Sequence, residues 1–272
     1  MPIDITSPAN PLIKRLKSLA DKKGRRAEGL FLAEGLRVCT EALASGHVPA
    51  VLIFSPDAEA HPLTQALIAA TEASRGSAVR TTRDILQRLT GKDNAAPVAA
   101  AFAIPGTGLA GLDRFAAPMW VVAENLKDPG NLGTMLRTCD ATGAGGVILL
   151  DQSCDPFSVE AVRASMGALF TKAVVQTDGA AFLRWLRDGP GELVGAALDG
   201  PVTDYRAQRW AVPTFLFMGN EQSGLPPAYA AECDALVRLP MRGSADSLNV
   251  AVATAVLLYA VLAQLEPASS GT

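Results

Sequence analysis

The sequence predicts an α/β protein with two domains, and three features of the chain indicate it. Short apolar runs alternate with helical patterns along all 272 residues, an order typical of parallel sheets that are covered by helices on both faces. A stretch rich in glycine and proline, residues 105–118, interrupts both patterns. Hydrophobic residues make up 49% of the chain, which excludes an intrinsically disordered protein.

The first part of the chain combines three expected strands with four expected helices. The strands are predicted at 30–34, 50–54 and 98–104, and the helices near 10–20, 35–45, 62–74 and 82–89. The second part is longer and follows the same alternation. Its strands are predicted at 119–123, 146–150, 172–176, 193–198, 214–218 and 235–239, and its helices near 131–142, 158–169, 178–187 and 248–265. We therefore expect a domain over 1–104, a linker over 105–117, a second domain over 118–266 and a frayed tail over 267–272.

Composition excludes several classes of protein. The four cysteines, Cys39, Cys139, Cys154 and Cys233, are too far apart for a paired metal-binding motif, and the chain has only two histidines. We therefore expect no metal site and reduced cysteines, as in a cytoplasmic protein. The N-terminus shows no apolar segment typical of a secretory signal. Residues 248–265 carry no charge, but their length and internal polar residues favour a buried or interface helix over a membrane span.

The segment GTGLAG, residues 106–111, matches the GxGxxG pattern of dinucleotide-binding proteins. That motif works when it opens a long helix, whose N-terminus faces the phosphates. Here Pro105 precedes the segment and Pro118 follows it closely, so no amphipathic helix fits. We interpret the segment as a flexible linker and keep a nucleotide-dependent enzyme as the alternative.

A loop and helix at 123–150 form the first segment that could carry chemistry. The loop follows a predicted strand, at the edge of the sheet where ligands usually bind. Asn131 is expected to cap the helix, which has an apolar stripe and can end at Gly143. Arg137 lies off that stripe and shares another face with Thr134. Periodicity alone favours an arginine that is simply solvated.

Two further loops follow predicted strands. After the strand at 214–218, Gly219 permits close approach of the backbone to a ligand, and Glu221 and Gly224 complete the turn. The alternative is an ordinary glycine-rich turn. After the strand at 235–239, Ser247 is expected to begin the long apolar helix, where Asn249 is unusual. Asn249 either pairs with nearby backbone or lines a polar site.

Together, these segments resemble the three motifs of the SpoU/TrmH-type RNA 2′-O-ribose methyltransferases of the SPOUT class. The segment 157–170 also resembles a connecting segment of that family. The motifs occur in the family's order across residues 119–265. The matching residues are Asn131 and Arg137 in the first motif, Gly219, Glu221 and Gly224 in the second, and Pro240, Met241, Ser247, Leu248, Asn249 and Val250 in the third.

Residues 1–104 resemble a substrate-binding domain, related to small ribosomal RNA-binding proteins, that often precedes this fold. The local charge agrees, because residues 10–26 contain seven lysines and arginines against Asp21 alone, although the whole chain has a net charge of −3. Such a cluster favours binding to RNA phosphates. The expected RNA-binding residues are Lys14, Arg15, Lys17, Lys22, Lys23, Arg25, Arg26 and, in the second part, Arg163.

The resemblance implies a small N-terminal α/β RNA-binding domain and a trefoil-knotted α/β methyltransferase domain with a parallel sheet, assembled as a homodimer. It implies that S-adenosylmethionine is the cofactor. The cofactor-binding residues would be Gly219, Asn220, Leu239, Met241 and Leu248. The catalytic residues would be Arg137, Asn131, Glu221, Ser247 and Asn249. The expected substrate is ribosomal RNA, with a guanosine of 23S rRNA favoured. A transfer RNA methyltransferase and a non-catalytic knotted RNA-binding protein are the alternatives.

Overall fold

The structure is a computed structural model that describes residues 1–106, 108–198 and 200–265. The expected tail at 267–272 lies outside the described residues. The chain divides into two compact units. Unit 1 consists of Met1–Gly106 and Asp155–Thr171, and unit 2 consists of Thr107–Cys154 and Lys172–Thr272.

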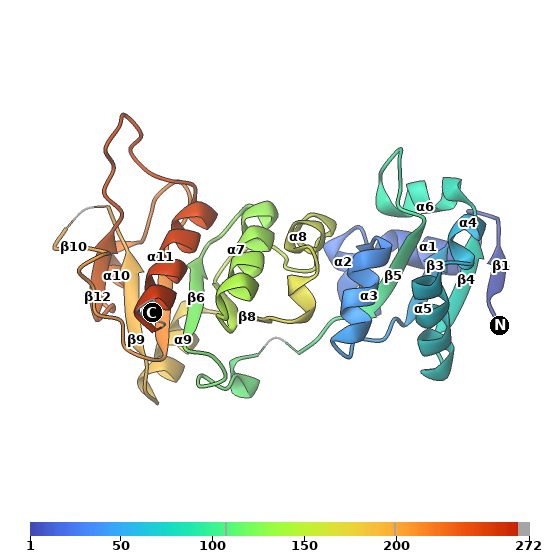
Figure 1. Cartoon of the computed structure of the whole chain (residues 1–272). Coiled ribbons are helices and arrows are strands. Elements are labelled where there is room, and N and C mark those ends of the chain that lie inside the picture. The colour runs from blue at the N-terminus through green and yellow to red at the C-terminus, as the bar shows by residue number, and fades with distance from the viewer. Residues whose placement is uncertain (107, 199, 266–272) are drawn as a thin grey trace, which may run out of the picture. The chain divides into compact units, whose positions relative to one another are not determined.

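Unit 1 contains a five-stranded sheet with helices around it (Figure 1). Its strands are β1 (Ile3–Ile5), β2 (Leu30–Glu34), β3 (Val51–Phe54), β4 (Ser77–Thr81) and β5 (Val98–Ala103). Its helices are α1 (Pro11–Ser18), α2 (Lys22–Glu28), α3 (Leu36–Ala44), α4 (Pro56–Glu59), α5 (Pro62–Ala73), α6 (Arg83–Thr90), α8 (Val159–Ser165) and the short η2 (Ala168–Phe170). The strand order is β1-β4-β3-β5-β2.

The sheet of unit 1 is mixed, which corrects the expectation of parallel sheets throughout. Strands β1, β3 and β4 pair in parallel, whereas β5 lies between β3 and β2 and runs antiparallel to both. An apolar run shows that a strand is buried but does not show its direction, which depends on the path of the chain. Strands β1 and β4 were not expected, because each is too short or too polar to form an apolar run.

The segment Asp155–Thr171 packs on unit 1, although the sequence suggested a continuous second domain over 118–266. Phe157 and Phe170 lie on Phe31 of β2, with ring centroids 5.1 and 5.7 Å apart, respectively. Phe170 also packs edge-on against Phe102 of β5. All four rings are buried, so their removal from water holds the segment in place.

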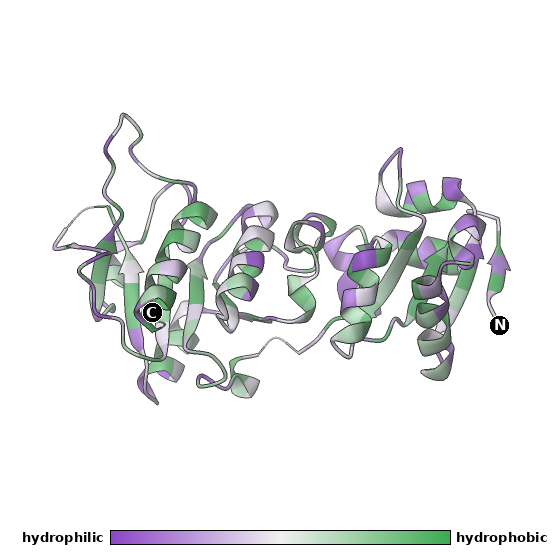
Figure 2. Ribbon diagram, viewed as in Figure 1, coloured by the Kyte–Doolittle hydropathy of each residue, from purple (hydrophilic) through white to green (hydrophobic). Residues whose placement is uncertain are grey.

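Unit 2 contains a seven-stranded sheet in which every pair of strands is parallel, as expected. The strand order is β10-β12-β9-β11-β6-β7-β8. The strands are β6 (Met119–Glu124), β7 (Gly146–Leu150), β8 (Ala173–Thr177), β9 (Glu192–Ala196), β10 (Thr203–Asp204), β11 (Thr214–Met218) and β12 (Ala235–Arg238). The helices are η1 (Leu109–Gly111), α7 (Pro129–Thr142), α9 (Gly179–Arg187), α10 (Pro227–Ala230) and α11 (Val250–Leu265). The central strands and α11 are mainly hydrophobic (Figure 2).

Much of the stretch expected to be a flexible linker is an ordered part of unit 2. Leu109 and Leu112 pack against its core. The guanidinium of Arg114 donates hydrogen bonds to the carbonyls of Trp185 and Pro190, at 2.6 and 2.8 Å, and lies 4.1 Å from the centre of a Trp185 ring. The GTGLAG segment leads only into the three-residue η1, so it lacks the long helix that dinucleotide binding requires.

The uncharged stretch at 248–265 folds into α11, which begins at Val250 and packs against α7 and β11. Within the described residues, no helix is both long enough and apolar enough to cross a membrane.

Candidate functional site

The first two motif loops lie side by side because β11 pairs with β6. Met218, the last residue of β11, is in register with Ala123, so both strands end at the same edge of the sheet. The strand order of unit 2 changes direction between β6 and β11. Ligands of open parallel sheets bind at such a point, beyond the carboxyl ends of the strands. The pairing therefore places both loops at the position expected for a ligand site.

The start of α7 differs from the expectation in one residue. Asp128, and not Asn131, caps the helix, and its Oδ1 accepts a hydrogen bond of 2.6 Å from the backbone nitrogen of Gly130. Pro129 begins the helix because its fixed backbone angle suits the first turn and its missing N–H leaves no donor unpaired. The side chain of Asn131 is thus free for contacts outside the helix. The helix ends at Gly143, as predicted.

Asn131 joins the three motifs through hydrogen bonds. Its Nδ2 donates to Oε1 of Glu221 at 3.1 Å, and its Oδ1 accepts from Nδ2 of Asn249 at 3.0 Å. The Glu221 carboxylate also accepts from the backbone nitrogens of Asp128, at 3.4 Å, and Lys127, at 3.5 Å. The carboxylate therefore holds the loop after β6 against the loop after β11.

Asn249 has a second task at the start of α11. Its Oδ1 accepts from the backbone nitrogens of Ala251 and Val252, at 2.9 and 3.3 Å, in the manner of an N-cap. Both interpretations of Asn249 therefore hold, because it pairs with nearby backbone and also contacts Asn131. Ser247, which was expected to begin the helix, lies before it on the exposed loop.

The loop after β11 is a tight turn. The backbones of Asn220 and Gly224 exchange two hydrogen bonds, of 3.1 and 2.9 Å. Nδ2 of Asn220 donates to the carbonyl of Asn125, at 2.8 Å, which ties this turn to the loop after β6. A Cβ at Gly219 would overlap the backbone of Gly224 and Leu225. Glycine is therefore required at this position by the turn's own backbone, and its close approach to a ligand stays a prediction.

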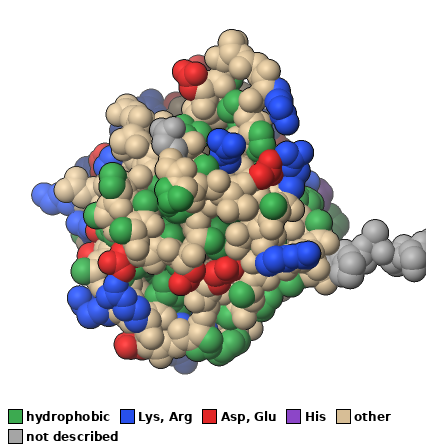
Figure 3. All heavy atoms as spheres, turned by 90° about the vertical axis from the view of Figure 1, so that its left-hand side faces the viewer, with side chains coloured by type: hydrophobic (Ala, Val, Ile, Leu, Met, Phe, Trp, Pro, Cys, Tyr) green, Lys and Arg blue, Asp and Glu red, His purple; other side chains and the backbone are tan. Residues whose placement is uncertain are grey.

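A cavity of about 960 Å³ opens between the loops that follow β9, β11 and β12 and the helix α11. All five residues expected to bind the cofactor lie on its wall, together with Glu221, Ser247 and Asn249. Much of the remaining wall is aliphatic and includes Leu236, Val237 and Leu257. Among the described lining residues, Glu221 is the one charged side chain. Figure 3 shows this end of unit 2, where acidic and basic side chains are interspersed without a large patch of either sign.

Arg137 is exposed and lies apart from the Asn131 network. At 3.6 residues per turn, it points roughly 120° away from Asn131 around α7. Within the described residues, its side chain makes no hydrogen bond or ion pair, and it does not line the cavity. One copy of the chain therefore brings together Asn131, Glu221 and Asn249 but leaves Arg137 outside their network.

Comparison of the chain with family models and known proteins identifies its family. The model of the SpoU rRNA methylase family matches residues 118–259, and that of the MRM3-like substrate-binding domain matches residues 10–100. The chain is 30% identical to the 23S rRNA (guanosine(2553)-2′-O)-methyltransferase RlmP of Bacillus subtilis, over 94% of this chain and 97% of that protein. It is 29% identical to the 23S rRNA (uridine(2479)-2′-O)-methyltransferase of Streptomyces viridochromogenes, over 90% and 87% of the two chains.

The fold also matches solved structures. An S-adenosylmethionine-bound rRNA methyltransferase from Sinorhizobium meliloti superposes with a TM-score of 0.89, at 35% identity, over 97% of this chain and 98% of that one. The chain belongs to the SpoU rRNA methylase family. This confirms the resemblance seen in the motifs, the α/β fold class, the enzyme class of RNA 2′-O-methyltransferase, and S-adenosylmethionine as the cofactor.

In this SpoU-family chain, sequence reasoning missed several polar residues at the end of β6 and in the loop that follows it. Glu124 ends β6 almost fully buried, and burial raises the pKa of its carboxyl above the ordinary value. Oδ1 of Asn125 accepts from the backbone nitrogen of Gln152 at 3.2 Å, and Nζ of Lys127 donates to the carbonyl of Gln152 at 2.8 Å. These contacts join the loops after β6 and β7. The sequence feature that could have indicated these residues is the pair Glu124-Asn125, directly after the strand predicted at 119–123.

The residues expected to bind RNA differ in how accessible their side chains are. Arg25 is a correction, because only 3% of it is exposed and its guanidinium pairs with Asp155 at 2.7 Å and donates to the carbonyls of Leu19 and Ala20. A buried, fully paired arginine holds the fold and is not available to RNA. Arg15 pairs with Glu28. The others are exposed or lie on the rim of a cleft: Lys14, Lys17, Lys22, Lys23, Arg26 and Arg163.

Proposed function

We propose that this SpoU-family methyltransferase modifies a ribose 2′-hydroxyl of large-subunit ribosomal RNA. The main support is the cavity of unit 2, whose wall carries the five expected cofactor residues beside the Asn131–Glu221–Asn249 network. The two relatives described above act on 23S rRNA, one at a guanosine and the other at a uridine. Guanosine specificity, the trefoil knot and a cytoplasmic location stay predictions.

The residues of the cavity fit S-adenosylmethionine in shape and charge. Gly219 permits the tight turn that shapes this wall, because a Cβ there would overlap the backbone of Gly224 and Leu225. Leu239, Met241 and Leu248 supply apolar surface, and Glu221 supplies the one carboxylate of the described wall. When bound, S-adenosylmethionine supplies a methyl group on a positively charged sulfonium. A wall with a carboxylate and no cation among its described residues suits a ligand that carries that charge.

The chain's own residues then have distinct tasks. The aliphatic wall excludes water, which favours a reaction in which opposite charges cancel. Asn131 and Asn249 hold the loops in place and direct polar groups toward the ribose. We assign Arg137 as catalytic. Because a guanidinium keeps its proton at all ordinary pH values, its role is to stabilise the negatively charged 2′-oxygen or the neighbouring phosphate.

A second copy of the chain would complete the site. Helix α11 leaves Val252 and Tyr259 about half exposed, at 48% and 52%, on a helix without a charged side chain. It packs against α7, which carries Arg137. We propose that two copies associate through this apolar face and that Arg137 of one copy approaches the Asn131 network of the other. Sedimentation of the purified chain tests the dimer.

Arg137→Ala is the decisive variant for this function. Loss of one group that stabilises developing charge lowers turnover by about 100-fold or more, while ground-state binding of S-adenosylmethionine is unchanged. The measurement is methyl transfer to an unmodified 23S rRNA transcript, together with calorimetric binding of the cofactor. Arg184→Ala, on the exposed side of α9, is the matched control and should keep wild-type turnover. Normal turnover in Arg137→Ala would reject the assignment.

A further inference from the structure

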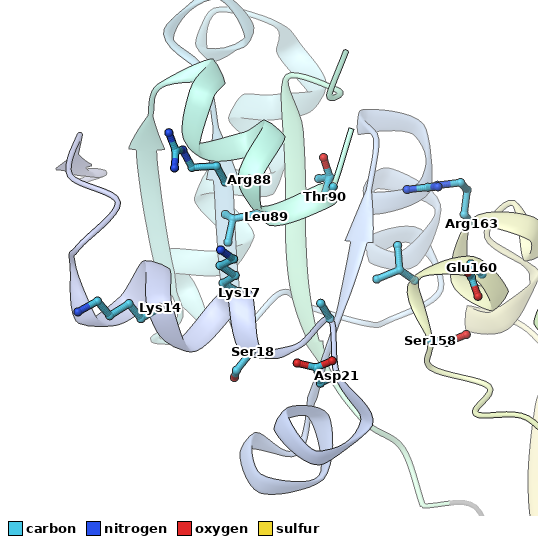
Figure 4. Close-up of a pocket in the computed structure, with 13 residues that line it drawn as sticks. Lys14, Lys17, Ser18, Asp21, Arg88, Leu89, Thr90, Ser158, Glu160 and Arg163 are labelled. Atoms are coloured by element: carbon cyan, nitrogen blue, oxygen red, sulfur yellow. The ribbon is translucent and has the colours of Figure 1, made fainter. Parts of the chain in front are cut away.

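A second cavity is lined by residues of unit 1, and none of its lining residues is among those assigned to chemistry. It is a cleft of about 720 Å³ between α1, the end of α6 and the start of α8 (Figure 4). Four cationic side chains line it, from Lys14, Lys17, Arg88 and Arg163, against the two carboxylates of Asp21 and Glu160. The cleft is thus locally basic in a chain that is acidic overall.

The cations of the cleft differ in how far they are already neutralised. Arg88 pairs with Asp84 at 2.8 Å and Arg163 pairs with Glu34 at 3.4 Å. Lys14 and Lys17 are exposed and, within the described residues, make no ion pair. Three residues apart on α1, they lie on one side of the helix. Their charges are therefore available to a ligand without breaking an existing pair.

We infer that this cleft binds a stretch of RNA backbone and that α8 forms one wall of the binding site. This inference rests on the proposed function, because it names where the RNA substrate is held. In Figure 4 the four cationic side chains are spread along the cleft, two of them on α1 and one each on α6 and α8. A small anion is held by groups that converge on one point, whereas a polyanion is matched by charges distributed along a surface.

The remaining groups of the lining also suit RNA. Ser158 supplies a hydroxyl group whose oxygen accepts from the backbone nitrogen of Ala161 and whose proton can be donated to a phosphate oxygen. The carboxylates of Asp21 and Glu160 accept hydrogen bonds, and an RNA strand offers 2′-hydroxyl donors that DNA lacks. Arg163 comes from Asp155–Thr171, which connects two parts of the methyltransferase sequence but packs on unit 1. Through it, the catalytic family domain itself contributes to the RNA site.

The test compares two pairs of cations that carry the same charge. Lys14→Gln/Lys17→Gln removes two cations from the cleft, and the control Arg75→Gln/Arg184→Gln removes two exposed cations that neither line the cleft nor belong to the expected RNA-binding residues. Binding of an unmodified 23S rRNA transcript to the full chain is titrated at several salt concentrations without S-adenosylmethionine. Each lost phosphate contact reduces the slope of log K against log salt by about 0.7 to 0.9. The cleft pair should lose about 1.5 units of slope, and the control pair should lose none.

Equal losses in both pairs, or a loss in the control pair alone, would overturn the assignment of the cleft. Arg163→Gln should remove a further unit or slightly less, and an unchanged slope would overturn the role of α8. Saturable binding of inorganic phosphate that depends on Lys14 and Lys17, with an unchanged RNA slope, would make the cleft a small-anion site. Methylation by the wild-type chain is scored separately. Its absence would reject the proposed function and leave the binding result intact.

Discussion

Asn131 and Gly219 show how single residues set the geometry of the site. Asn131 uses both atoms of its amide, the nitrogen toward Glu221 and the oxygen toward Asn249. An aspartate in its place would put two carboxylates about 3 Å apart, and an alanine would leave both partners unpaired. Gly219 acts through the absence of a side chain, because the backbone of Gly224 and Leu225 occupies the space of a Cβ.

Gly219→Ala should weaken S-adenosylmethionine binding by about tenfold or more. The added methyl group forces the turn at 219–224 to move, and overpacking of this kind costs about 1–3 kcal/mol. The measurement is calorimetric titration of the cofactor. Gly243→Ala is the control, since a Cβ at Gly243 meets no atom within 4 Å. Equal affinity in both variants would show that the turn does not shape the cofactor site.

At the scale of elements, Arg25 links α2 to the segment Asp155–Thr171. Its guanidinium donates to Asp155 and to two carbonyls at the end of α1 and just after it, so it spans three pieces of chain. A charged residue in a basic run would ordinarily be solvated, and the sequence suggested contact with RNA. Burial reverses that role, because a buried charge is tolerated only when it is paired and hydrogen-bonded.

Arg25→Gln should destabilise unit 1 by about 3 kcal/mol, because it leaves the Asp155 carboxylate without its partner. All three tryptophans of the chain lie in unit 2, at 120, 185 and 210, so tryptophan fluorescence would miss the change. Hydrogen exchange of peptides from β2 and β5 is the appropriate measurement. The exposed neighbour supplies the control, and Arg26→Gln should change the stability by less than about 0.5 kcal/mol. Equal protection in both variants would contradict the structural role of Arg25.

At the scale of the whole molecule, the two compact units are not successive pieces of sequence. The chain leaves unit 2 after Cys154, contributes α8 and η2 to unit 1, and returns at Lys172. Unit 2 nevertheless contains all the described residues that line the cofactor cavity. Removal of the N-terminal part should therefore leave cofactor binding intact and lower the solubility of the chain.

A chain that begins at residue 107 should bind S-adenosylmethionine but expose Phe157 and Phe170, which are buried in the full chain. Exposed apolar surface of this kind promotes aggregation. We expect stronger binding of a hydrophobic dye than in the full chain, and Phe157→Ser/Phe170→Ser in the truncated chain should reduce it. Weak dye binding by the unsubstituted truncated chain would show that the segment finds another partner within unit 2.

The sequence alone determined the features that depend on local pattern. All six strands predicted in the second part appear at or within a residue or two of their expected bounds, from Met119–Glu124 to Ala235–Arg238. The runs of β6, β7 and β11 have no polar face, and these three strands are buried throughout. The three motifs were visible for a similar reason. Glycine, proline and capping residues have strong local preferences, and they mark where strands end and helices begin.

Only the tertiary structure decided which of these elements contact one another. Strand β11 lies beside β6, although 90 residues separate the motif residues Asn131 and Glu221. The same holds for the antiparallel placement of β5, the burial of Arg25 and the packing of Phe157 on Phe31. Each depends on contacts between residues distant in sequence, and periodicity carries no information about partners. Burial of apolar surface and pairing of buried polar groups select those partners, and both act only once the chain has folded.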